Sequence, residues 1–78
     1  MNTLEEFVSN FAEQFETTDP KDITAATHYR SLPDWDSLAA LSLIAMVNAN
    51  YNVQLKGRDI RGATTVEDVY NMVMSKMS

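Results

Sequence analysis

The sequence predicts an all-α fold in which three main helices and one short helix form a bundle. Its 78 residues include two glycines and two prolines, which is too few for a turn-rich β protein. Apolar residues recur at intervals of three and four, the spacing of one helical face. We expect a single domain, 1–78, with main helices at about 3–16, 36–51 and 64–76 and a short helix at about 57–62.

The first helix is predicted by its start and by its apolar face. Thr3 and Glu6 have the spacing of a capping box, in which a hydroxyl and a carboxylate satisfy free amides of the first turn. The residues of the apolar face are Leu4, Phe7, Val8, Phe11 and Phe15. We therefore expect this helix to begin near Thr3 and to bury that face.

A long connection follows, between Glu16 and Asp36. A length of about 20 residues is unusual between helices, where two to eight are typical, so the segment is either functional or contains an irregular turn. We expect Ile23, Tyr29 and Leu32 to tuck under this connection and anchor it.

The second helix is predicted to begin after Asp36, whose carboxylate would cap it. Between Leu38 and Ala49 only Ser42 and Asn48 are polar, so the apolar surface is wider than one face requires. The expected inward face comprises Ala40, Leu43, Ile44, Val47 and Tyr51. The residues expected to meet solvent, a partner or a ligand are Leu38, Leu41, Ala45 and Met46.

The last third of the chain predicts a short helical turn around Ile60 and then a final helix. Thr64 and Glu67 repeat the capping-box spacing, so the final helix is expected to start there. Its apolar residues are Val66, Val69, Val73 and Met77.

The composition excludes several classes of function. The net charge of −5 disfavours phosphate contacts, so we expect no nucleic-acid partner. The absence of cysteine removes disulfides, thiolate metal sites and any cysteine nucleophile, and leaves the chain without a thiol. No apolar run reaches the roughly 20 residues that cross a bilayer, and the first residues are acidic where a signal peptide is basic. We expect a cytoplasmic monomer that does not insert into a membrane.

Ser37 is the candidate functional residue, because it falls in the first turn of the second helix directly after a loop. Free amides and the helix dipole there stabilise an attached phosphate by about 0.3 to 1 kcal/mol when exposed, although Asp34 and Asp36 oppose part of this. A serine after a capping Asp is, however, common in any helical protein.

A catalytic role for this serine is not favoured. His28 is the single histidine, and a hydrolase would need it beside Ser37. The sequence has no glycine-flanked nucleophile elbow, and so small a domain cannot surround a substrate. We expect no catalytic residue and no metal site, with Asp34 and Asp36 solvated or capping.

The triplet Asp36, Ser37 and Leu38 matches the Asp-Ser-Leu signature that opens the second helix of the acyl carrier protein family. The downstream positions that match the family's core residues are Leu41, Leu43, Ile44, Val47, Tyr51, Val53 and Leu55. Thr64, Thr65 and Val66 match its turn into the last helix. The chain therefore resembles a freestanding acyl carrier protein over nearly its whole length, which implies that family's four-helix bundle.

The resemblance implies a carrier and not an enzyme. A phosphopantetheinyl transferase would use coenzyme A and Mg²⁺ to attach a phosphopantetheine arm to Ser37, with Asp36 presenting the serine and Leu38 contacting the transferase. The arm would supply the missing thiol, hold acyl groups as thioesters, and shuttle them between acyl-activating and acyl-transferring enzymes.

The sequence departs from the family in its charges. Asp34 stands where the family commonly has Gly. The positions at which fatty-acid carriers have docking acids are here occupied by Ala39, Ser42, Asn48, Ala49 and Asn50. These departures favour a specialised carrier for lipid, polyketide or surface-polysaccharide assembly over a housekeeping fatty-acid carrier. Its expected docking residues are Trp35, Leu38, Leu41, Ala45 and Met46.

Three alternatives stay open at this point. The chain could be an aminoacyl or peptidyl carrier, although those usually have a residue other than Asp before the serine. It could be an unmodified helical interaction module that uses its apolar second helix. Trp35 could anchor a partner or fold back over the bundle. For a carrier, we expect a cleft between the second helix and the last two to receive a short apolar acyl chain.

Overall fold

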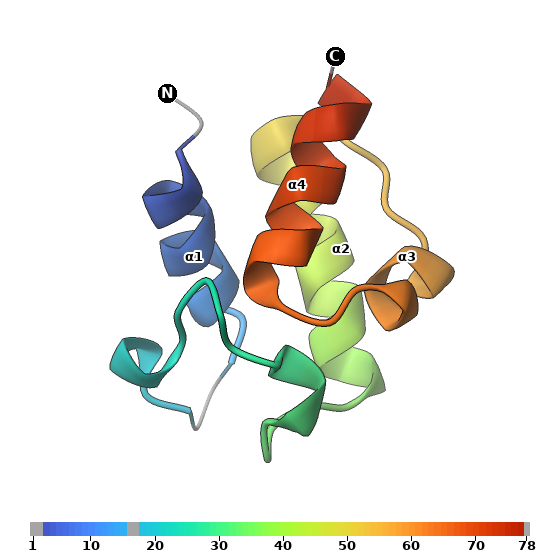
Figure 1. Ribbon diagram of the computed structural model, residues 1–78. Coiled ribbons are helices and arrows are strands. Elements are labelled where there is room, and N and C mark those ends of the chain that lie inside the picture. The colour runs from blue at the N-terminus through green and yellow to red at the C-terminus, as the bar shows by residue number, and fades with distance from the viewer. Residues whose placement is uncertain (1–2, 16–17, 78) are drawn as a thin grey trace.

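The computed structural model describes residues 3–15 and 18–77, and within these ranges the only regular structure is helical. The helices are α1 (Leu4–Ala12), α2 (Ser37–Tyr51), α3 (Gly57–Gly62) and α4 (Val66–Met77), with short 3-10 turns at Pro20–Asp22 and Tyr29–Ser31 (Figure 1). This arrangement confirms the predicted all-α bundle of three main helices and one short helix.

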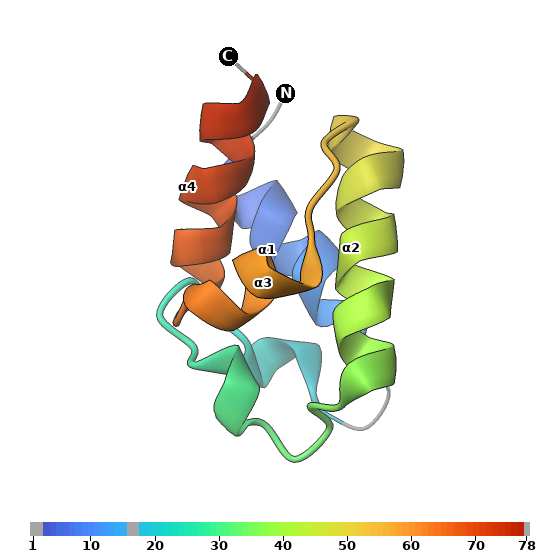
Figure 2. The same ribbon diagram turned by 90° about the vertical axis from the view of Figure 1, so that its right-hand side faces the viewer.

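The three main helices run along the long direction of the molecule. α1 is antiparallel to α2 and α4, and it packs against both (Figures 1 and 2). The short α3 lies across the space between α2 and α4 and contacts α2. The connection from α1 to α2 covers the end of the bundle at which α2 begins.

α1 begins as predicted and ends early. The Thr3 hydroxyl accepts a hydrogen bond from the Glu6 amide at 3.2 Å. The helix stops at Ala12, because tighter turns follow in which the amides of Gln14 and Phe15 donate to carbonyls three residues back. Phe15 is nevertheless buried. The expected last residue of this helix, at position 16, lies outside the described residues.

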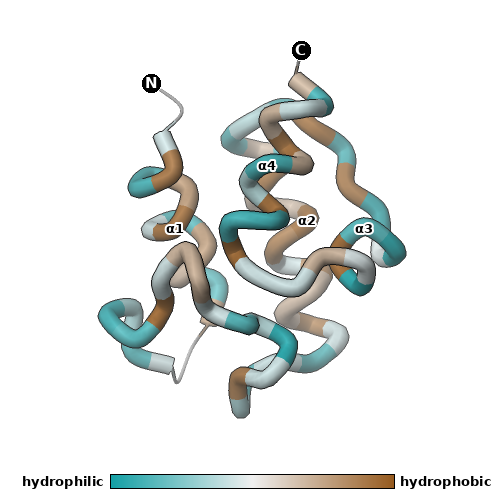
Figure 3. The backbone as a smooth tube through the Cα atoms, in the orientation of Figure 1, coloured by the Kyte–Doolittle hydropathy of each residue, from teal (hydrophilic) through white to brown (hydrophobic). Residues whose placement is uncertain are grey.

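The buried face of α2 differs from the predicted one. It comprises Ala39, Leu43, Met46, Val47 and Tyr51. Met46 was expected to face a partner but is only 6% exposed, whereas the expected inward residues Ala40 and Ile44 are half-buried. The reason is that α2 is apolar on nearly all sides, as its mostly brown and pale tube in Figure 3 shows, so its pattern carries little information on its rotation.

α4 is capped one residue later than predicted, by Thr65 in place of Thr64. The Thr65 hydroxyl accepts from the Asp68 amide at 3.2 Å, and the Asp68 carboxylate accepts from the amides of Thr65 and Thr64 at 3.0 and 3.1 Å. The pair Thr64 and Glu67 therefore does not form the expected capping box. The Glu67 amide instead donates to the Ala25 carbonyl of the connection at 2.9 Å, which leaves the capping to the next residue pair.

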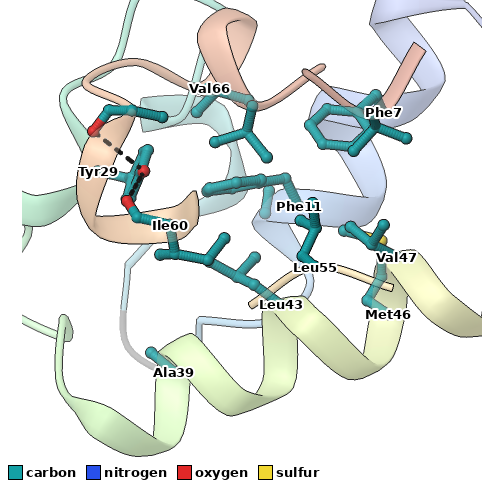
Figure 4. Packing of buried hydrophobic residues seen from close by; sticks show 14 of the residues in the cluster. Phe7, Phe11, Tyr29, Ala39, Leu43, Met46, Val47, Leu55, Ile60 and Val66 are labelled. Carbon is teal, nitrogen blue, oxygen red and sulfur yellow. Dashed lines mark hydrogen bonds between the residues drawn. The ribbon is translucent and has the colours of Figure 1, made fainter. Parts of the chain in front are cut away.

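The connection is anchored by the three residues that the sequence predicts. Ile23 and Tyr29 are buried, and Leu32 packs against the core. The Tyr29 hydroxyl donates to the carbonyl oxygens of Ile60 and Ala63, so it ties the connection to the C-terminal end of α3 (Figure 4). Burial raises the pKa of Tyr29 to about 12. The connection thus forms part of the core.

Candidate functional site

Ser37 is the first residue of α2, and its side chain is exposed. Asp36 caps the helix as predicted: its carboxylate accepts from the Ala39 amide at 2.8 Å, and its carbonyl accepts from the Ala40 amide at 3.1 Å. The hydroxyl of Ser37 therefore stands at a well-formed helix start, accessible from outside the bundle.

Two first-turn amides remain available beside this hydroxyl. The amides of Ser37 and Leu38 donate no hydrogen bond to any other residue in the ranges 3–15 and 18–77. Unpaired amides at the positive end of a helix are a favourable environment for a phosphate group. An exposed hydroxyl for attachment and two free donors beside it fit a phosphodiester-linked group, with the Asp36 carboxylate as an opposing charge.

The loop that leads to Ser37 is held at each residue. Leu32 to Trp35 form a turn in which the Trp35 amide donates to the Leu32 carbonyl at 3.0 Å, with Pro33 at a position that such turns favour. The Trp35 ring meets the edge of Tyr29 with a centroid distance of 5.1 Å. Trp35 thus folds back over the bundle and stays half-buried.

Asp34 makes a contact that sequence reasoning missed. One oxygen of its carboxylate accepts from both the amide and the hydroxyl of Thr18, at 2.7 and 2.9 Å. Asp34 was expected to be solvated or to cap a helix, and the structure shows it instead half-buried and bonded to Thr18. The 16-residue separation of the two partners has no helical or strand period, so only the path of the connection reveals the contact.

A depression of about 230 Å³ opens beside Ser37, on the side of α2 that faces the end of α1. Its lining residues are Gln14, Phe15, Asp34, Asp36, Leu38, Ala39 and Ser42. On the side of α2 where we expected an acyl cleft, Leu43, Ile60 and Val66 are buried and pack together (Figure 4). An acyl chain could enter there only by displacing these side chains.

The outer face of α2 is apolar and uncharged. Leu38 and Leu41 are 68% and 63% exposed, and Ala45 is also exposed. No charged residue occurs between Ser37 and Leu55. Three of the expected docking residues thus lie on one exposed helical face, and Met46 does not belong to it.

The remaining candidates for catalysis or metal binding are His28 and the acidic side chains. His28 is exposed. At the start of α4, hydrogen bonds from the Thr65 and Thr64 amides hold the pKa of the Asp68 carboxyl below its ordinary value, and His28 adds a smaller lowering effect. In the part of the chain that the structure describes, no group of three His, Cys, Asp or Glu side chains is close enough to hold a metal ion.

A small helical bundle with an exposed serine at the start of its second helix has the layout of a carrier domain. A family model described as the phosphopantetheine attachment site matches residues 5–73. The chain therefore belongs to this family, whose members are carriers with a covalently attached phosphopantetheine group. No curated protein and no solved structure matches the chain. Of the helices described, none has the length and apolarity to cross a membrane.

Proposed function

We propose that this protein is an acyl carrier protein in which Ser37 bears the phosphopantetheine arm. The observation that supports this assignment most directly is the exposed Ser37 hydroxyl at the start of α2, beside the Ser37 and Leu38 amides, which donate to no residue within 3–15 and 18–77. These amides would stabilise the attached phosphodiester. Asp36 keeps the helix start formed while the serine is modified.

The attachment has a simple chemical balance. The Ser37 oxygen bonds to the phosphorus of the phosphopantetheine part of coenzyme A, the pyrophosphate bond breaks, and the adenosine bisphosphate part leaves. The proton of the serine hydroxyl is released in the same step. When bound, the group supplies the thiol that the cysteine-free chain lacks, and that thiol holds acyl groups as thioesters. The chain's own residues then present the arm and dock to the enzymes that load and unload it, without catalysing either reaction.

The proposed docking surface is the outer face of α2, formed by Leu38, Leu41 and Ala45. Because α2 has no charged residue, we infer that docking depends mainly on apolar contact and that the carrier serves a specialised pathway. Trp35 lies beside the start of this face and can add to it with its accessible part.

The apolar docking surface predicts binding that tolerates salt. We expect the affinity of the loaded chain for an acyl-transferring partner, measured by titration calorimetry, to change less than about threefold between 0.1 and 1 M salt, although the Debye length falls from about 10 to 3 Å. Neutralising the exposed Lys56, Arg58 and Arg61 to Gln serves as a control and should leave the affinity nearly unchanged. A collapse of binding at high salt would reject apolar docking.

The attachment site is tested by intact mass spectrometry. The chain is incubated with coenzyme A, Mg²⁺ and a broad-specificity phosphopantetheinyl transferase. We expect one adduct on the native chain, one on Ser31→Ala, and none on Ser37→Ala. Ser31 is a suitable control because it is also exposed and lies six positions before Ser37. A native chain that stays unmodified would favour an unmodified interaction module, and an adduct on Ser37→Ala would place the attachment elsewhere.

A further inference from the structure

We propose that Asp34 is a positioning residue, which holds the loop before Ser37 in the conformation that the phosphopantetheinyl transferase binds. This inference rests on the proposed modification of Ser37. It assigns to Asp34 a role that depends on its bond to Thr18 and that involves no contact with the transferase or with coenzyme A.

The Asp34 carboxylate is held firmly by Thr18. A single oxygen accepts two hydrogen bonds from Thr18, at 2.7 Å from the amide and 2.9 Å from the hydroxyl. Hydrogen bonds to an ionised carboxylate are among the stronger ones in proteins. Both groups are half-buried, which limits the competition from water. The contact therefore joins the two ends of the long connection between α1 and α2.

The three residues before Ser37 are held by different parts of the domain. Asp34 is bound to Thr18 at the start of the connection. Trp35 packs against Phe15 and Tyr29, with centroid distances of 6.4 and 5.1 Å. Asp36 is bound to the first turn of α2. After three consecutive fixed residues, the Ser37 side chain is the first that is free to be taken by an enzyme.

The Thr18 contact should raise the fraction of molecules in which the loop has the conformation that the transferase binds. An enzyme that binds one conformation of its substrate has an apparent affinity reduced by the fraction of molecules in that conformation. Loss of the Thr18 contact would release the turn at Leu32 to Trp35, and the competent fraction would fall. The KM of the transferase for the carrier should then rise while kcat stays nearly constant.

The test compares three variants under steady-state modification by the transferase and coenzyme A. Asp34→Ala removes the acceptor. Asp34→Asn removes the charge but keeps an oxygen that can accept from both Thr18 groups. Thr18→Val removes the hydroxyl and leaves the amide. We expect KM for the carrier to rise roughly tenfold in Asp34→Ala and a few-fold in Thr18→Val, with kcat within about twofold. In Asp34→Asn the weaker, neutral hydrogen bonds should keep the rise clearly smaller than in Asp34→Ala.

A second measurement separates positioning from general destabilisation. Trp35 is the single tryptophan, and it directly follows Asp34, so its fluorescence anisotropy decay reports the mobility of the loop. We expect added fast motion in Asp34→Ala and little in Asp34→Asn. Urea unfolding must show each variant to be fully folded at the assay temperature.

Each outcome decides the inference. An unchanged KM in Asp34→Ala would overturn it. An Asp34→Asn variant as impaired as Asp34→Ala would also overturn it, because the charge would then act on the transferase directly. Failure of the native chain to be modified would reject the proposed function itself, and that result is distinct from any difference among the variants.

Discussion

The first and second helices differ in what they present to solvent. α1 is amphipathic: it buries Phe7 and Phe11 and exposes carboxylates such as Glu5 and Glu6. α2 carries no charge, and its exposed side includes Leu38 and Leu41 at more than 60% exposure. The solvated face of α1 has no need of a partner. The outer face of α2 leaves apolar surface in water, which favours its use as a contact surface.

The strongest test of this comparison uses two leucines of α2. Leu43 is fully buried and Leu41 is 63% exposed. We expect Leu43→Ala to lower the free energy of unfolding by about 2 to 5 kcal/mol, because it leaves a cavity, and Leu41→Ala to change it by less than about 0.5 kcal/mol. Urea denaturation followed by circular dichroism measures both variants. Equal losses in the two would mean that the outer face of α2 is covered within the domain.

A smaller effect is expected at Tyr29, which fastens the connection to α3. Tyr29→Phe leaves the carbonyls of Ile60 and Ala63 without this donor and should cost about 1 to 3 kcal/mol. The native pKa is raised from 10.0 to about 12, so the unfolded chain loses this proton first as the pH rises. The native protein should therefore lose stability from about pH 10 upward, through the native pKa.

Urea midpoints measured at pH 8 and above pH 10 test this pH dependence. The Phe variant is the control, since it lacks the titrating group and should lose less stability over the same interval. Parallel losses in both proteins would assign the alkaline destabilisation to other groups.

The smallest effect is expected at the start of α2. Asp36→Ala removes the bond from the Ala39 amide and should cost about 0.5 to 2 kcal/mol. It should also slow modification of Ser37, as measured by the rate of adduct formation. Asp36→Ser is a matched control, because a serine hydroxyl can cap the same amide and should recover most of the stability. Unchanged urea midpoints in Asp36→Ala would reject the role of this cap.

The sequence predicted the buried side better for the amphipathic α1 than for the uniformly apolar α2. The apolar residues of α1 fall on one side and its polar residues on the other, so the Thr3 cap and the buried Phe7 and Phe11 were predicted correctly, whereas Leu4 and Val8 are only half-buried and the buried Ala12 was not predicted. α2 is apolar nearly all round, so Met46 was assigned to the wrong side. At the start of α4, two threonines precede two acids, so the local sequence allows either threonine to cap the helix. Thr65 is the cap because the Glu67 amide, which would bond to Thr64, donates to the distant Ala25 carbonyl.

The start of α2 at the candidate site could be predicted from the sequence, but the contact that holds the preceding loop could not. The Asp36 cap and the position of Ser37 at the start of α2 were predicted from local sequence alone, and the family match agrees with a phosphopantetheine arm, whose attachment to Ser37 stays a proposal. The contact of Asp34 with Thr18 depends on how a long irregular segment returns to its start. Local periodicity contains no information about such a contact.

The hydrogen bonds between the connection and the start of α4 should make unfolding of the domain cooperative. The amides of Val66 and Glu67 donate to the carbonyls of Thr27 and Ala25, about 40 positions earlier in the chain. A peptide comprising only the last two helices lacks these acceptors, so its final helix should fray at its first turn. Folding of the C-terminal part therefore requires the N-terminal part, and the domain should unfold in one concerted transition.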